Sequence, residues 1–204
     1  MNDRSNGYER VAAEFLAGRG SARGRSKAIG VKAVREWART LPRGTSIIDI
    51  GCGPGFPLTE VLVAEGLKVN AVDASPSFVE VFRGNLPKIP VACEAVEDSA
   101  FFRRTFDAAI AVGLIFLLPA EKQRRLIRRH FGAWRAAAIY VACRRRAIGM
   151  ARCDDRIGIA IAGAVEYRSQ LAAAGLSAIG EYEDEGANHY FDALKSAPAD
   201  SRRE

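Results

Sequence analysis

A glycine-rich loop at the end of a short apolar run is the first group of residues that could do chemistry. Residues 46–50 read Ser-Ile-Ile-Asp-Ile, and Gly51-Cys52-Gly53-Pro54-Gly55 follows directly. Glycine lets the backbone turn tightly and approach a ligand closely, and the helix expected from Pro57 would offer free N–H groups at its start. The loop matches neither the dinucleotide-binding fingerprint, which needs glycine where this chain has Phe56, nor a P-loop, because no Gly-Lys-Ser/Thr follows.

Asp73 is the second such residue, and it closes another apolar run, residues 67–72, 18 residues after Gly55. A carboxylate at that place can accept hydrogen bonds from both hydroxyls of a ribose. The alternative is a helix N-cap ahead of Pro76, since Asp favours that role. Because the glycine loop and the acid occur together at this spacing, we predict that Asp73 binds a ribose.

A third segment, Cys-Glu-Ala-Val-Glu-Asp at 93–98, follows the next apolar run. An acidic side chain there can meet the exocyclic amine of adenine, and small apolar neighbours can flank the ring. A solvated loop explains this segment equally well.

The elements that must position these groups alternate along the chain. Helical spacing of apolar residues predicts helices over 8–17, 28–40, 57–66, 76–86 and 121–134, and apolar runs predict strands over 46–50, 67–72, 90–93 and 106–112. This alternation is typical of a doubly wound α/β fold with a mostly parallel sheet and helices on both faces. Such sheets bind ligands beyond the carboxyl ends of their strands, where all three signals fall.

Three segments, residues 48–55, 72–75 and 106–110, together resemble class I S-adenosylmethionine-dependent methyltransferases. The resemblance covers residues from about 28 to about 130, and less closely the chain from about 165. It implies a seven-stranded sheet whose last strand is antiparallel, and S-adenosylmethionine as the cofactor. The cofactor-binding residues that it implies are Asp49, Gly51, Cys52, Gly53, Gly55, Asp73, Ala74, Glu94, Ala95, Val96 and Val112.

The acceptor side carries weaker signals. No Asn-Pro-Pro-Tyr/Phe box follows residue 112, which argues against methylation of planar amide or nucleobase amines. The apolar residues there indicate a small, partly hydrophobic acceptor, although plain core packing explains them equally well. Strands are expected over 176–182 and 189–194, with the link 183–188 facing the site. His189 is a candidate general base, with a structural histidine as the alternative. The predicted acceptor-binding residues are Leu114, Phe116, Asn188, His189 and Tyr190.

The segment after the expected helix 121–134 departs from the family pattern. A strand is expected over 139–143, but the usual Gly-Gly turn before it is missing, and one hypothesis is that residues 131–163 are read from a shifted frame. Residues 120–152 hold ten basic residues and one acidic residue, while the rest of the chain is net acidic. Because the positive charge is local, a solvated helix face explains it better than a nucleic-acid-binding surface.

Composition sets the remaining expectations. The chain of 204 residues is 49% hydrophobic and 26% charged, as for one globular domain. We expect a helical cap over 1–45, a methyltransferase domain over 46–195 and a disordered tail over 196–204, in a cytoplasmic protein without a membrane segment. The four cysteines show no metal-ligand spacing, so no metal is expected. The predicted function is methylation of a small-molecule acceptor; the alternatives are an RNA or protein methyltransferase that uses the arginine-rich segment and a non-catalytic nucleoside-binding module.

Overall fold

A single sheet lies at the centre of the molecule. The computed structural model describes residues 4–18, 29–129, 138–144, 164–186 and 188–195. In this part of the chain the strands follow the order β3-β2-β1-β4-β5-β7-β6. They are β1 (Ser46–Ile50), β2 (Lys68–Asp73), β3 (Val91–Cys93), β4 (Ala108–Val112), β5 (Ala138–Arg144), β6 (Leu176–Glu183) and β7 (Asn188–Lys195). β1 to β5 pair in parallel, and β7 is antiparallel to both β5 and β6.

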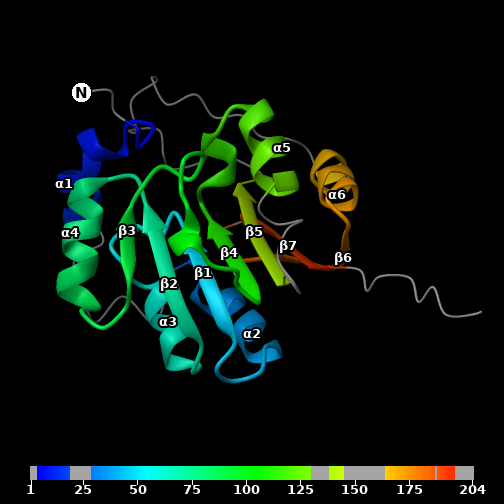
Figure 1. The fold of residues 1–204 in the computed structure, drawn as a ribbon, viewed down its shortest axis with the longest axis horizontal. Coiled ribbons are helices and arrows are strands. Elements are labelled where there is room, and N and C mark those ends of the chain that lie inside the picture. Colours follow the sequence, from blue (N-terminus) through cyan, green and yellow to red (C-terminus); the bar gives the residue numbers. More distant parts are fainter. Residues whose placement is uncertain (1–3, 19–28, 130–137, 145–163, 187, 196–204) are drawn as a thin grey trace, which may run out of the picture.

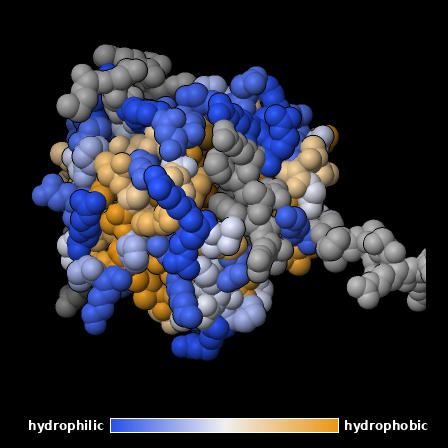
Figure 2. All heavy atoms as spheres, viewed as in Figure 1, coloured by the Kyte–Doolittle hydropathy of each residue, from blue (hydrophilic) through white to orange (hydrophobic). Residues whose placement is uncertain are grey.

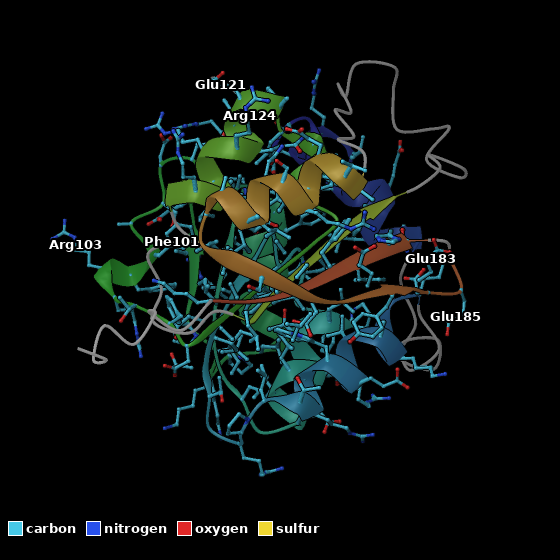
Figure 3. The ribbon with its side chains drawn as sticks, turned by 90° about the vertical axis from the view of Figure 1, so that its right-hand side faces the viewer. Phe101, Arg103, Glu121, Arg124, Glu183 and Glu185 are labelled. Atoms are coloured by element: carbon cyan, nitrogen blue, oxygen red, sulfur yellow. The ribbon has the colours of Figure 1, made fainter. Side chains whose placement is uncertain are left out.

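Helices cover both faces of this sheet (Figure 1). They are α1 (Tyr8–Gly18), α2 (Val31–Thr40), α3 (Leu58–Ala64), α4 (Pro76–Asn85), α5 (Ala120–Arg129) and α6 (Ala164–Ala173), with short 3-10 turns η2 (Phe101–Arg103) and η3 (Ile115–Leu117). Figure 3 shows α5 and α6 on one side of β6 and β7 and α2 and α3 on the other. The predicted α/β class is therefore confirmed.

Alternation along the strands builds a separate core on each face. On β1, Ile48 and Ile50 belong to a cluster that includes residues of α5 and α6, whereas Ile47 belongs to a cluster that includes residues of α2 and α3. The same alternation on β7 places Phe191 in the first cluster and Tyr190 in the second. Successive strand residues point to opposite faces, so residue parity decides which side chains can share a site.

A buried polar contact connects the first part of the chain to the last strand. Trp37 of α2 donates its indole Nε1–H to the Asp192 carboxylate of β7 at 3.2 Å, across 155 residues of sequence. Burial raises the pKa of the Asp192 carboxyl, and the Trp37 hydrogen bond opposes this shift. The expected boundary between a helical cap and the methyltransferase domain, at residue 45, falls between α2 and β1. The side chains of these two elements share one core.

Several expectations fall wholly or partly beyond the described residues. The tail 196–204 lies outside them, and so does most of the segment 131–163, for which a shifted reading frame was considered. Within that segment the backbone of β5 is described, and it pairs in parallel with β4 over residues 138–142, which include most of the expected strand 139–143. No helix in the described ranges is long and apolar enough to cross a membrane.

Candidate functional site

The glycine loop lies at the carboxyl end of β1, where the chain order of the sheet reverses between β1 and β4. Gly51 and Gly53 adopt φ angles of 74° and 56°, a region that side chains disfavour. A Cβ at Gly51 would lie 3.0 Å from the Leu114 Cβ, whereas a Cβ at Gly53 would meet nothing within 4 Å. The loop therefore presents bare backbone to an open space.

That space is a cavity of about 250 Å³ at the carboxyl ends of the strands. All but one of the residues predicted to bind the cofactor line it: Asp49, Gly51, Cys52, Gly53, Asp73, Ala74, Glu94, Ala95, Val96 and Val112. Gly55 is the exception, because it faces Phe82 of α4 and Leu86, which follows that helix. Of the predicted acceptor-binding residues, Leu114, Phe116, Asn188 and Tyr190 line the cavity.

Asp73 joins the glycine loop to the start of α4. Its Oδ2 accepts a hydrogen bond from the Gly53 N–H at 2.8 Å, and its Oδ1 accepts one from the Ser75 N–H at 2.9 Å. Burial raises the pKa of the Asp73 carboxyl, and the backbone donors oppose the shift. The N-cap of α4 is Ser75, whose Oγ accepts from the Phe78 N–H. The alternative role of Asp73 as the N-cap of this helix is therefore wrong.

Asp49 lies beneath the loop with only 5% of its surface exposed. Its Oδ2 accepts a hydrogen bond from the Thr59 hydroxyl of α3 at 2.7 Å. Burial raises the pKa of Asp49 to about 7; the Thr59 hydrogen bond opposes this shift, and the negative charge of Asp73 adds to it. A cationic ligand in the cavity would favour the ionised carboxylate.

The segment after β3 closes the other side of the cavity. The Glu94 N–H donates to the Asp73 carbonyl at 2.9 Å, so this segment begins beside β2. Ala95 and Val96 are buried, with 7% and 5% exposed. The Glu94 carboxylate accepts from the Ala100 N–H at 3.2 Å, which orders the turn that follows. An acidic group and two small apolar side chains thus face the same space.

At the opposite end, the link between β6 and β7 contributes polar groups, and Glu183 and Glu185 mark its position in Figure 3. Asp184 accepts hydrogen bonds from the Tyr190 hydroxyl at 2.6 Å and from the Asn188 Nδ2 at 2.8 and 3.0 Å. A Cβ at Gly30 would lie 2.5 Å from the Tyr190 oxygen, so glycine lets the chain before α2 pass close to this group.

His189 lies between Asn188 and Tyr190 in the sequence, but it is not among the residues that line the cavity. Its Nε2 is 2.8 Å from Glu181 Oε2, and its ring packs 4.7 Å from that of Phe191. It therefore lies on the face of β7 that carries Phe191, opposite Tyr190. The structure brings His189 to neither the cofactor loop nor the acceptor end, so it gives the general-base role no support.

Sequence reasoning missed one whole wall of the cavity. Residues before and within α1 line it, and so do apolar residues near α2, α3 and α4: Arg4, Ser5, Asn6, Tyr8, Phe15, Ile29, Phe56, Leu58 and Phe78. Helical spacing predicted α1 but could not show where it docks. The walls carry several carboxylates, and among the described residues no group of His, Cys, Asp and Glu could hold a metal ion. This arrangement suits a cationic ligand that contains a nucleoside.

Comparisons with known proteins bear on this site. Residues 47–135 match the family model described as methyltransferase domain. The chain is similar to magnesium protoporphyrin IX methyltransferase from Synechocystis PCC 6803, with a TM-score of 0.76 and 14% identity over 96% of this chain and 98% of that one. It is also similar to 1,6-didemethyltoxoflavin-N1-methyltransferase from Burkholderia thailandensis, with a TM-score of 0.68 and 14% identity over 93% and 86%.

The cyclase SpnF shares the fold as well, with a TM-score of 0.72 and 15% identity over 97% of both chains. No curated protein sequence gave a significant match. Because a cyclase has this fold, the fold alone does not define the reaction, and the sequence match carries the class. Residues 47–135 match a methyltransferase domain, and the chain shares its fold with a methyltransferase whose structure holds bound S-adenosylmethionine. The predicted enzyme class is confirmed.

Proposed function

We propose that this chain transfers a methyl group from S-adenosylmethionine to a small-molecule acceptor. The observation that carries the proposal is one cavity that combines the glycine loop and Asp73 with a second, mainly apolar end. The sulfonium of the cofactor supplies an already activated methyl group, so the protein chiefly has to hold the two reactants in line. Two of the similar structures are of methyltransferases named for small molecules, magnesium protoporphyrin IX and 1,6-didemethyltoxoflavin.

The cofactor roles follow from the geometry of the loop. The bare backbone at Gly53 leaves room for the methionine part, and Asp49 offers a negative charge beneath it. Asp73 would accept hydrogen bonds from the ribose hydroxyls, and Glu94 with Ala95 and Val96 would surround the adenine. The sulfonium and ammonium charges of the cofactor would be compensated by these carboxylates.

The acceptor would lie at the end formed by Leu114, Phe116, Asn188 and Tyr190. Two of these side chains are apolar, and the other two are hydrogen-bonded to Asp184, so their orientation is fixed. A cavity with apolar walls and a few oriented polar groups is typical of a small-molecule site.

Labelled methyl donor tests the proposal directly. The protein is incubated with methyl-labelled S-adenosylmethionine and, separately, with small-metabolite, RNA and protein fractions of a cell extract. We expect label in the small-metabolite fraction, and none with Asp73→Ala. Label in the RNA or protein fraction would show that the arginine-rich segment serves a macromolecular acceptor. Cofactor binding with no transfer to any fraction would show a non-catalytic nucleoside-binding module.

The exposed positive charge of α5 is the reason for testing an RNA fraction. Arg124, Arg125 and Arg128 are exposed, and hydrophilic side chains gather over this helix in Figure 2. If these residues held RNA, affinity would fall steeply as the salt concentration rises.

A further inference from the structure

The N-terminal segment forms one wall of the cavity and touches two other elements. Tyr8 and Phe15 line the cavity, and their rings lie 6.2 and 5.1 Å from the ring of Phe78 in α4. Asn6 donates its Nδ2–H to the Leu117 carbonyl of η3 at 3.2 Å. The segment therefore crosses the cavity from α4 to η3, and Figure 1 shows α1 beside α4.

Glu9 attaches this segment to the first turn of α4. Its Oε2 accepts hydrogen bonds from the Ser75 hydroxyl and from the Ser77 N–H, the latter at 3.2 Å. Its Oε1 accepts a hydrogen bond from the Ser77 hydroxyl at 2.6 Å. A carboxylate at this position is also favoured by the partial positive charge of the helix N-terminus. The attachment is thus specific, since three donors at the N-cap and in the first turn of α4 meet one side chain of α1.

Ser75 transmits this attachment to the cofactor loop. Its hydroxyl donates to Glu9 and accepts from the Phe78 N–H, while its own N–H donates to Asp73 Oδ1 at 2.9 Å. The other oxygen of Asp73 holds the Gly53 N–H. A movement of Glu9 therefore reaches the cofactor loop through only two intervening residues.

We propose that α1 is part of the cofactor site and that Glu9 is a positioning residue, which acts through Ser75 to hold Asp73 in place for the ribose of a nucleoside ligand. The inference rests on the proposed cofactor site, and it adds a dependence of that site on a helix outside residues 47–135. The aromatic wall of Tyr8, Phe15 and Phe78 would then cover the nucleoside end of the cavity.

One effect of Glu9 acts in the opposite direction. Its negative charge raises the pKa of Asp73, but this is the smallest of the influences on that carboxyl. Loss of the charge would favour ionised Asp73 slightly, whereas loss of the hydrogen bonds would free Ser75 and the start of α4. The hydrogen bonds are the larger contribution because they involve a charged acceptor.

Calorimetric titration with S-adenosylhomocysteine and with adenosine tests this inference on the full chain. For Glu9→Ala we expect an affinity about tenfold lower for both ligands, the size of one lost hydrogen bond to a charged group. Glu9→Gln retains one acceptor oxygen and should lose less. Ser77→Ala removes the hydroxyl that donates to Glu9 Oε1, keeps the backbone N–H that donates to Oε2 and leaves Ser75 untouched, so its loss should be smaller than that of Glu9→Ala.

The matched control is Glu14→Ala, which removes the same charge from an exposed position of the same helix. Its affinity should equal that of the parent. Equal affinity of Glu9→Ala and the parent, or an equal loss in Glu14→Ala, would refute the positioning role. If Glu9→Ala does not fold, Ser77→Ala decides by the same comparison. Absence of binding by the parent would instead refute the cofactor site itself.

Discussion

The two ends of the cavity are built in different ways. The cofactor end comes from three segments at the carboxyl ends of β1, β2 and β3, at 49–55, 73–75 and 94–96, and their contacts to one another are largely through backbone N–H groups. The acceptor end combines η3 with the link between β6 and β7, and the contacts that orient the Asn188 and Tyr190 side chains there are made with another side chain, that of Asp184. Backbone contacts tolerate many sequences around a few fixed residues, whereas side-chain contacts depend on every partner. The cofactor end can therefore bind one common ligand while the residues of the acceptor end vary.

The largest expected effect is on stability, at the cofactor end. Burial raises the pKa of Asp49 to about 7 from 3.8, so the folded state binds the proton more tightly than the unfolded state. The resulting stabilisation is complete below pH 4 and is lost as the pH rises through 7. Asp49→Asn removes this dependence and should raise the free energy of unfolding at pH 8 by about 4 kcal/mol at most.

Urea unfolding of both proteins at pH 5 and pH 8 measures the difference. The substitution should also weaken S-adenosylmethionine binding, because a negative charge beneath a cationic ligand is lost. A parent stability that does not change between the two pH values would contradict the assignment of a raised pKa to Asp49.

The next largest effect is on cofactor affinity. If Asp73 binds the ribose as proposed, Asp73→Ala removes charge-assisted hydrogen bonds, each worth about 1.5 to 3 kcal/mol, so affinity should fall by about two powers of ten or more. Asp73→Asn leaves one acceptor oxygen for two backbone donors and should also bind poorly, while remaining folded. Calorimetry with S-adenosylhomocysteine measures both, and Glu80→Gln, at an exposed position of α4, is the control. Affinity within twofold of the parent would overturn the ribose role.

A smaller effect should separate the acceptor end from the cofactor end. Tyr190→Phe removes the hydroxyl that donates to Asp184, so the link between β6 and β7 loses one contact. We expect about 1 kcal/mol lower stability. The affinity for S-adenosylhomocysteine should be unchanged. Transfer of the labelled methyl group to the small-metabolite fraction should be about tenfold slower, because the acceptor is positioned less well. Equal losses of cofactor binding and of transfer would show that the two ends are not separable.

The smallest effect is expected at His189. His189→Gln keeps a group that can donate to Glu181, and the residue lies away from the cavity. Methyl transfer should remain within twofold of the parent from pH 6 to pH 9. A loss of tenfold or more at unchanged stability would restore His189 as a general-base candidate.

The sequence allowed the cofactor end and part of the acceptor end to be predicted, but not the wall of the cavity that α1 forms. A strand, a glycine loop and Asp73 are adjacent elements, so local spacing carries most of their geometry. The position of α1 depends on the hydrogen bonds of Glu9 with Ser75 and Ser77. These contacts span more than 60 residues of sequence, so no local pattern encodes them.

The expectation for β7 shows a different reason for failure. Asn188, His189 and Tyr190 were all predicted to face the acceptor, but consecutive strand residues point to opposite faces. Because of this alternation, either His189 or the pair Asn188 and Tyr190 can face the acceptor, but not all three. Phe191 is buried in the cluster that includes residues of α5 and α6, so His189 lies on that face and the other two lie on the opposite face. That burial depends on packing between distant elements, so the sequence alone left the choice open.

The contact between Trp37 and Asp192 has a consequence for synthesis of the chain. A polypeptide made from its amino end completes α2 and β1 to β4 long before β7 exists. Until then the indole N–H of Trp37 lacks its carboxylate partner, and the apolar face of α2 lacks Tyr190. Native packing of α2 therefore waits until β7 has left the ribosome, and a nascent chain stopped before residue 188 would hold α2 without this partner strand.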